Sequence, residues 1–459
     1  MSSATLSYDL LCLIFHTLQE DNATVSQCAL VNRGFSRAAS RSLYSNVVLS
    51  AGDSSRVSSA ALPHNASYVQ VLSILSTECI SPAMLLDAVK AFENMHTLEI
   101  LPKDWQTFRV EDLLDGILLE LKNRASLVKL RVNPSCTTEA TAPILADIGG
   151  LRELALASPS RAILQLLPDW LERLSPSLRE LHLTGNCGSI TPGILRSFAP
   201  LLANLTAFSL GLSYSIVDDD LFDFLGQLPC LETVQLQHYV QFKPAQKGAL
   251  LSRLRSLTVL HQPFYEEDHA TRLATSVLHA LSGAPAVERV RLCCEEYEED
   301  AEFAPRGLDA LLDHLTPTCS TLRVLDLGGS LVSELPLTAF CRAAVALEEL
   351  TIALDMNGFT AFKNLVPTMS CLHTATLKVY TIGCRLFLVN VEDADRIMQS
   401  SVVLRRLAVN GMRTEGSWVC ERHGDGRFVV VEVASRRAGR QESNPPSMGM
   451  ILEEEEEEE

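Results

Sequence analysis

The stretch Leu178-Arg179-Glu180-Leu181-His182-Leu183 has the form L-x-x-L-x-L, in which three apolar positions are separated by polar ones. Phrases of this form occur thirteen times in order between residues 69 and 409, and their first residues lie 23 to 35 positions apart. One or two copies arise by chance in a leucine-rich chain, but thirteen in order do not. The phrases are Val69/Leu72/Ile74, Met95/Leu98/Ile100, Leu127/Leu130/Val132, Leu151/Leu154/Leu156, Leu178/Leu181/Leu183, Leu205/Phe208/Leu210, Leu231/Val234/Leu236, Leu254/Leu257/Val259, Val287/Val290/Leu292, Leu322/Leu325/Leu327, Leu347/Leu350/Ile352, Leu372/Ala375/Leu377 and Leu404/Leu407/Val409.

The period suits one short strand and one helix per unit, which predicts an α/β fold of the leucine-rich-repeat type. We expect an irregular, right-handed, horseshoe-shaped solenoid of about thirteen units over residues 51–410. One unit cannot bury its apolar face alone, so the stacked units together form the core. Capping residues or a first-turn proline between the phrases predict helices at 83–92 after Ser81-Pro82, at 193–202 after Thr191-Pro192, and at 221–225 after Asp218 to Asp220.

The C-terminal part of the chain carries a hairpin signal and then an acidic tail. Residues 418–420 and 427–433 are rich in apolar and β-branched residues and flank the turn sequence His423-Gly424-Asp425-Gly426. We therefore expect a hairpin within residues 411–440 that caps the open end of the solenoid. Residues 441–459, with their run of glutamates, are expected to be disordered.

Composition and charge limit the possible partners. The formal net charge is −18, and removing the seven glutamates at 453–459 still leaves −11. Nucleic acid is therefore not expected as a partner, because phosphate binding needs clustered Lys and Arg. Residues 10–15 are apolar but too short to span a bilayer and lack a preceding basic residue, so we expect neither a membrane partner nor a signal peptide. Thirteen cysteines without a C-x-x-C pair indicate free thiols in a reducing compartment, cytoplasmic and possibly nuclear.

No motif for phosphate binding, zinc proteolysis or an exposed nucleophile occurs in the chain. Its histidines are dispersed among the repeats, and adjacent Cys293 and Cys294 beside an acidic run favour a solvated turn over a metal site. From the sequence we therefore expect that the protein is not an enzyme and that it has no catalytic residues, no cofactor and no metal site.

The first fifty residues contain two further apolar blocks. Residues 6–18 read LSYDLLCLIFHTL, and residues 28–39 read CALVNRGFSRAA, followed by Leu43-Tyr44. These blocks resemble the F-box. The first helix of that family has the pattern L-P-x-E/D-L/I-L-x-x-I-F-x-x-L, and its second segment has the pattern L-V-C-R-x-F-x-x-A. The family's Pro after the first Leu is Ser7 here, and a serine can still cap the helix. We expect an F-box-like helical domain at residues 1–50.

The resemblance implies a substrate-recognition subunit of an SCF-type ubiquitin ligase. In that family the F-box docks on the Skp adaptor, and through it on a cullin-RING ligase, while the repeats bind a protein substrate. Transferred to this sequence, the adaptor contacts fall on Leu6, Ser7, Leu10, Ile14, Val31 and Phe35. The alternatives are a simple N-terminal cap, which needs only one apolar face, and a repeat scaffold that binds proteins without any ligase.

Strand alternation also predicts where an unknown protein substrate would bind. Residues on either side of the middle leucine of each phrase point away from the core, and a curved solenoid presents its largest concave surface there. The predicted substrate-binding residues are Glu153, Glu180, His182, Thr233, Gln235, Arg289, Arg291, Asp326, Glu349 and Thr351.

Overall fold

In the computed structural model, the described residues form sixteen strands of one continuous sheet, and the spatial order of the strands is their order in the sequence. The structure describes residues 6–18, 21–50, 64–76, 82–102, 110–122, 124, 126–239, 251–263, 267–294, 307–381, 389, 391–410, 417–422 and 428–433. The strands are β1 Asn46–Leu49, β2 Val71–Ile74, β3 Thr97–Ile100, β4 Lys129–Val132, β5 Glu153–Ala157, β6 Glu180–Asn186, β7 Ala207–Leu212, β8 Thr233–His238, β9 Ser256–His261, β10 Arg289–Cys294, β11 Val324–Val332, β12 Glu349–Asp355, β13 Thr374–Tyr380, β14 Arg406–Val409, β15 Ser417–Arg422 and β16 Phe428–Val433.

All neighbouring pairs from β1 to β14 are parallel. The second and third apolar residues of each of the thirteen phrases lie on one strand from β2 to β14, and the first apolar residue lies two positions before that strand. The middle residues of the phrases are partners in register, as Leu154, Leu181 and Phe208 show. These side chains are at most 1% exposed and belong to one core cluster that extends from Leu49 to Cys420. The α/β leucine-rich-repeat solenoid predicted from the phrases is confirmed.

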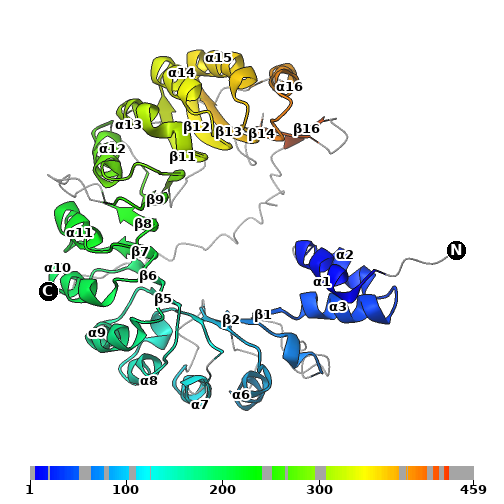
Figure 1. Cartoon of the computed structure of the whole chain (residues 1–459), viewed down its shortest axis with the longest axis vertical. Helices are drawn as coiled ribbons and strands as arrows, with labels where there is room; N and C mark the ends of the chain where they lie inside the picture. Colours follow the sequence, from blue (N-terminus) through cyan, green and yellow to red (C-terminus); the bar gives the residue numbers. More distant parts are fainter. Residues whose placement is uncertain are drawn as a thin grey trace, which may run out of the picture.

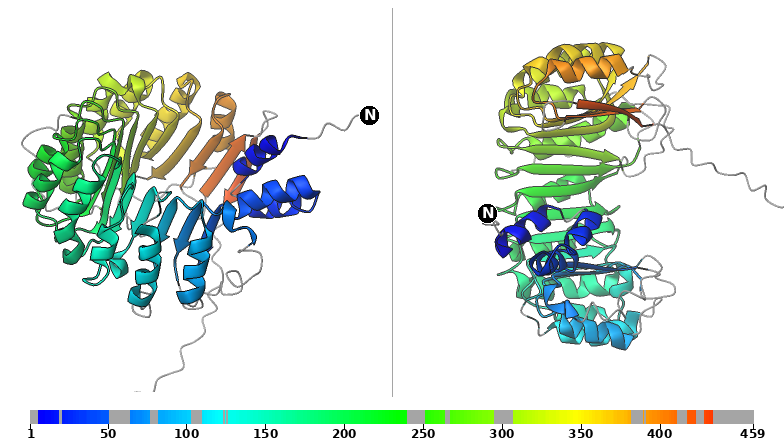
Figure 2. Two further views of the ribbon diagram at one scale, coloured as in Figure 1. Left: turned by 60° about the horizontal axis from the view of Figure 1, so that its bottom comes forward. Right: turned by 90° about the vertical axis from the view of Figure 1, so that its right-hand side faces the viewer.

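The helices lie on the outer side of the curved sheet, so the strands line the inner wall of a horseshoe (Figure 1). Figure 2 shows the same strands stacked along that wall. The helices of the solenoid are α6 Pro82–Ala91, α7 Val110–Lys122, α8 Ala142–Ala146, α9 Arg161–Leu174, α10 Pro192–Phe198, α11 Asp218–Leu225, α12 Glu267–Leu281, α13 Asp309–Leu315, α14 Glu334–Ala343, α15 Met356–Leu365 and α16 Val391–Ser400.

The three helices expected from capping signals are present, with shifted ends. Thr191 caps α10, its hydroxyl accepting from the Ile194 amide, and the chain then tightens into a 3-10 turn at 199–201. Helix α11 begins at Asp218 rather than Leu221, because three aspartates form its first turn, where the helix dipole favours negative charge. Helix α6 begins at Pro82, as the first-turn proline predicts, whereas Ser81 lies outside the described residues.

Before the sheet, the residues that the structure describes form three short helices, α1 Tyr8–Thr17, α2 Asn22–Cys28 and α3 Arg33–Leu43. They enclose a separate small core of Leu11, Phe15, Val25, Ala38 and Ala39. The chain then continues directly into β1, which carries no L-x-x-L-x-L phrase and pairs with β2. Residues 46–49 therefore belong to the sheet, although they lie inside the segment where the sequence predicts only helices.

The C-terminal end of the solenoid is covered by two antiparallel strands. β15 pairs with β14, and β16 pairs with β15. Cys420 on β15 is fully buried in the solenoid core. Arg422, also on β15, ties this strand to the last helical unit, because its guanidinium donates to the carbonyls of Met398 and Ser401 at 2.6 and 2.8 Å. The predicted turn at 423–426 and the acidic tail at 441–459 lie outside the described residues.

Candidate functional site

The inner wall of the horseshoe is built from strand residues that alternate with the buried leucines. Strand register aligns these residues in two rows, which we call the concave face. The first row is Thr97, Lys129, Glu153, Glu180, Ala207, Thr233, Ser256, Arg289, Val324, Glu349, Thr374 and Arg406; the second is Ser73, Glu99, Arg131, Ala155, His182, Ser209, Gln235, Thr258, Arg291, Asp326, Thr351, Thr376 and Ala408. All ten predicted substrate-binding residues lie in these two rows.

Exposure along the concave face is uneven. Thr233, Arg289, Arg291 and Glu349 are exposed, whereas Glu153 is only 8% exposed. The remaining predicted residues are half-buried: Glu180, His182, Gln235, Asp326 and Thr351. The face therefore combines exposed charges with charges held in specific contacts.

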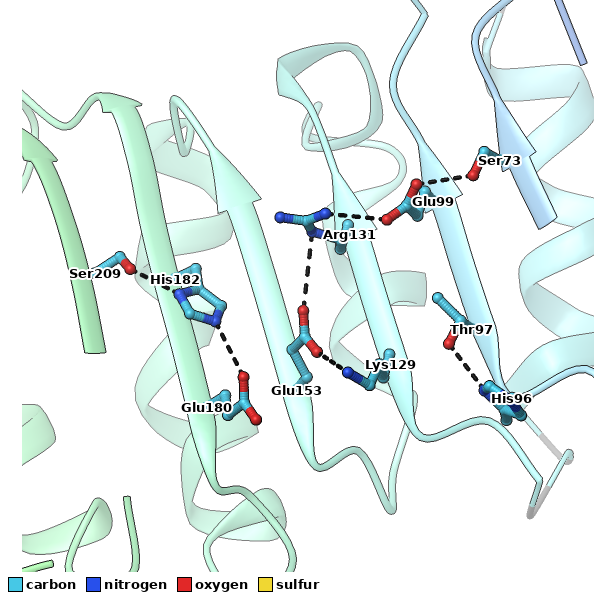
Figure 3. Close-up of polar contacts among 10 residues, drawn as sticks. All are labelled: Ser73, His96, Thr97, Glu99, Lys129, Arg131, Glu153, Glu180, His182 and Ser209. Carbon is cyan, nitrogen blue, oxygen red and sulfur yellow. Dashed lines mark hydrogen bonds and ion pairs between the residues drawn. The ribbon is translucent and has the colours of Figure 1, made fainter. Parts of the chain in front are cut away.

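One set of contacts joins β3, β4 and β5 around Glu153 (Figure 3). The Lys129 ammonium lies 2.6 Å from Glu153 Oε2, and this hydrogen bond raises the pKa of Lys129. Arg131 Nη1 lies 3.1 Å from Glu99 Oε1, and its Nε lies 3.9 Å from Glu153 Oε1. The nearly buried Glu153 carboxylate is thus stabilised by two cations from the preceding strand.

His182 continues the set toward β7. Its Nδ1 lies 2.7 Å from Ser209 Oγ, and its Nε2 lies 3.5 Å from Glu180 Oε2 (Figure 3). Burial lowers the pKa of His182, against the opposing effect of the Glu153 and Glu180 carboxylates. The imidazole is therefore mainly neutral at pH 7, with one donor and one acceptor nitrogen.

A second group of charges lies on β10 to β13. Arg291 Nη2 is 3.5 Å from Glu349 Oε2 two strands away. The Asp326 carboxylate accepts from the Gly328 amide at 2.9 Å, and burial raises the pKa of Asp326. Burial lowers the pKa of Lys378 on β13 to about 8, although Cys294 and Asp326 favour its charged form.

Lys378 should therefore become nucleophilic at lower pH than an ordinary lysine. We expect its acetylation rate to approach a plateau above pH about 8, because the neutral amine is then the major form. A lysine in a model peptide, whose pKa is about 10.4, should continue to gain reactivity up to about pH 10. Quantitative mass spectrometry after brief acetylation at a series of pH values checks this, and a midpoint near 10 at Lys378 would contradict it.

The six predicted adaptor contacts lie in the N-terminal helical unit. Leu6, Ser7, Leu10, Ile14 and Val31 are exposed. Ser7 is the N-cap of α1, and its hydroxyl accepts from the Leu10 amide at 3.3 Å, so the serine caps this helix as expected.

Phe35 differs from the other five predicted contacts. It is half-buried, and its ring packs edge-on against Phe15 with centroids 5.9 Å apart. Part of this ring therefore holds α3 against α1 within the unit. Helix α3 begins just before it, with Asn32 Oδ1 accepting from the amides of Gly34 and Phe35.

Several residues of the concave face were not singled out from the sequence. Glu99, Lys129 and Arg131 flank the middle leucines of the second and third phrases, and Ser209 follows the middle Phe208. The same positional rule that predicts Glu153 and His182 would have found them. Their pairing with particular partners is visible only once the strands are in register.

Comparison with known proteins leaves the family of this chain open. No protein-family profile and no curated protein matches the chain. Among solved structures, the yeast Rad7–Elc1 complex has 16% identity, a TM-score of 0.42, and coverage of 72% of this chain and 90% of that one. An internalin, InlF from Listeria monocytogenes, has 14% identity, a TM-score of 0.34 and coverage of 73% and 86%. A TLR13–ssRNA13 complex has 13% identity, a TM-score of 0.32 and coverage of 73% and 57%. These likenesses concern the fold alone.

Within the described parts of the chain, every helix is too short or too polar to cross a bilayer.

Proposed function

We propose that this chain is the substrate-recognition subunit of an SCF-type ubiquitin ligase, acting in the cytoplasm or nucleus. In this proposal α1–α3 dock on the Skp adaptor, which connects them to the cullin-RING ligase, and the concave face binds a protein substrate. The chain supplies no catalytic group. It raises the effective concentration of the substrate near the ubiquitin-conjugating enzyme.

The observation that carries the proposal is the apolar outer surface of the N-terminal helices. Leu10 and Ile14 are 42% and 37% exposed, whereas Leu11 and Phe15, one residue on, are at most 4% exposed. Leu30 and Val31, after α2, are still more exposed, at 80% and 62%. Helices that only cap the solenoid need one apolar face, whereas α1 has one facing its own core and one facing outward.

Large exposed apolar patches of this kind are typical of protein interfaces. The patch also includes Leu6 and Leu13, which are 49% and 60% exposed. Four of the six positions that the F-box resemblance assigns to the adaptor are among these exposed apolar residues, namely Leu6, Leu10, Ile14 and Val31. The chemistry of the patch therefore supports a protein partner with an apolar groove.

The Leu10→Ala/Ile14→Ala variant tests the adaptor contact. We expect its affinity for purified Skp adaptor to fall by about 30- to 1000-fold, because truncating two buried interface side chains costs roughly 2–4 kcal/mol in total. Surface plasmon resonance measures the change. Thermal unfolding should be almost unaffected, because neither side chain belongs to the buried core.

The matched control is Leu335→Ala, which truncates a leucine that is 81% exposed on α14. Adaptor affinity should be unchanged in this variant. If the wild-type chain does not bind the adaptor, or the double variant binds as well as the wild type, the chain is a ligase-independent repeat scaffold and the proposal is wrong.

A further inference from the structure

We propose that Glu153, Glu180 and His182 form a binding site for one divalent transition-metal ion, with Zn²⁺ the best match. The three residues belong to the predicted substrate-binding set on the concave face, but metal binding itself requires neither the adaptor nor a bound substrate. One carboxylate oxygen of each glutamate and one ring nitrogen of the histidine lie within 4.8 Å of one another. Figure 3 shows the three side chains projecting from β5 and β6 on the concave face.

One of the three separations matches that of ligands that share one ion, and all three lie within 4.8 Å, so small side-chain rotations would close the site. Zinc lies about 2.0–2.2 Å from nitrogen and oxygen ligands, so two ligands of a tetrahedral site are roughly 3.3–3.6 Å apart. His182 Nε2 and Glu180 Oε2 are 3.5 Å apart. Glu180 and His182 are two residues apart on one strand and share a face, and Glu153 is the register partner of Glu180.

Ser209 orients the imidazole toward the carboxylates. Its hydroxyl lies 2.7 Å from His182 Nδ1, so with the proton on Nδ1 the imidazole donates to Ser209 and the Nε2 lone pair faces Glu180. A metal-bound histidine typically has such a partner, because the hydrogen bond from its other ring nitrogen fixes the tautomer and the orientation. Carboxylate oxygen and imidazole nitrogen are both ligands that zinc accepts.

The surrounding charges permit a cation at this position. Glu99, Glu153 and Glu180 face Lys129 and Arg131, which is three negative groups against two positive ones. Lys129 contacts Oε2 of Glu153, whereas the other oxygen, Oε1, lies 3.9 Å from Arg131 Nε, beyond hydrogen-bonding distance. Both cations therefore compete with the ion for the Glu153 carboxylate, and Lys129, which makes the shorter contact, is the stronger competitor.

Three protein ligands leave one tetrahedral position open toward the interior of the horseshoe. Water completes the coordination in the isolated chain. A side chain of a protein bound to the concave face can replace that water, which would add a metal contact to the interface.

Titration calorimetry with Zn²⁺ alone, on the full chain without adaptor, tests the site. We expect one equivalent to bind and to raise the melting temperature by mass action. His182→Gln and Glu180→Gln should each weaken binding by about a hundredfold or more, because loss of a second-sphere partner alone costs 10- to 100-fold. Glu349→Gln, a carboxylate of the same row outside the site, is the control and should bind as the wild type does.

Two further variants distinguish a specific metal site from nonspecific binding of Zn²⁺ to surface carboxylates. Ser209→Ala should weaken binding by about tenfold or more without removing a ligand. Lys129→Met should strengthen binding, because it removes the cation that competes for Glu153. The absence of Zn²⁺ binding, equal binding by the His182→Gln variant, or weaker binding by Lys129→Met would overturn the proposal, and none of these results depends on whether the adaptor binds.

Discussion

Val234→Asp is expected to destabilise the chain by about 4 kcal/mol or more, because it leaves an unpaired carboxylate in the apolar core. Val234 is fully buried on β8 and is in register with Phe208 on β7 and Leu257 on β9. In a solenoid each unit depends on its neighbours, so the loss should extend beyond one repeat. Urea unfolding followed by circular dichroism should show a lower midpoint and a broader transition.

Thr233→Asp is the matched control, one residue earlier on the same strand. Thr233 is exposed, and its register partners Ala207 and Ser256 carry no charge. We expect a change within about 0.5 kcal/mol, as for most surface substitutions. Equal damage from the two variants would show that the inward and outward faces of β8 are assigned incorrectly.

Arg289→Glu/Arg291→Glu is expected to abolish capture of a protein that proximity labelling identifies as a substrate. Both arginines are exposed on β10, near the middle of the concave face. Arginines at interface centres often contribute 2 kcal/mol or more, which corresponds to about a 30-fold loss of affinity each. Pull-down with the labelled partners measures the loss.

The control for this variant is Arg161→Glu/Arg342→Glu, which makes the same change in charge on helices α9 and α14 of the outer side. It should retain every labelled partner. If the concave variant also retains all of them, substrate binds elsewhere on the solenoid.

The fold was predictable because its decisive signal is local. An L-x-x-L-x-L phrase predicts both the position of a strand and the residues that face the core. The near-regular spacing of the phrases along the chain indicates that successive strands pair. β1 was not predicted, because its sequence Asn46-Val47-Val48-Leu49 lacks the phrase. Only its pairing with β2 in the structure identifies it as a strand.

The candidate sites were predictable only in part. Alternation identifies Glu153, Glu180 and His182 as outward residues, yet Glu153 and Lys129 are 24 positions apart, and only the register brings them together. In α1 the sequence offers two apolar stripes, and it does not decide whether Leu10 or Leu11 faces inward. Phe35 is half-buried because it contacts Phe15, and this contact depends on how α3 packs against α1. No local sequence pattern predicts that packing.

Ubiquitin transfer in a reconstituted reaction tests the central proposal most directly. The reaction contains the Skp adaptor, the cullin-RING ligase and a protein captured by the concave face. We expect transfer with the wild-type chain and with Leu335→Ala, and loss of transfer with either Leu10→Ala/Ile14→Ala or Arg289→Glu/Arg291→Glu. Capture of the partner without any transfer by the wild-type chain, or transfer that survives both double substitutions, would contradict the account.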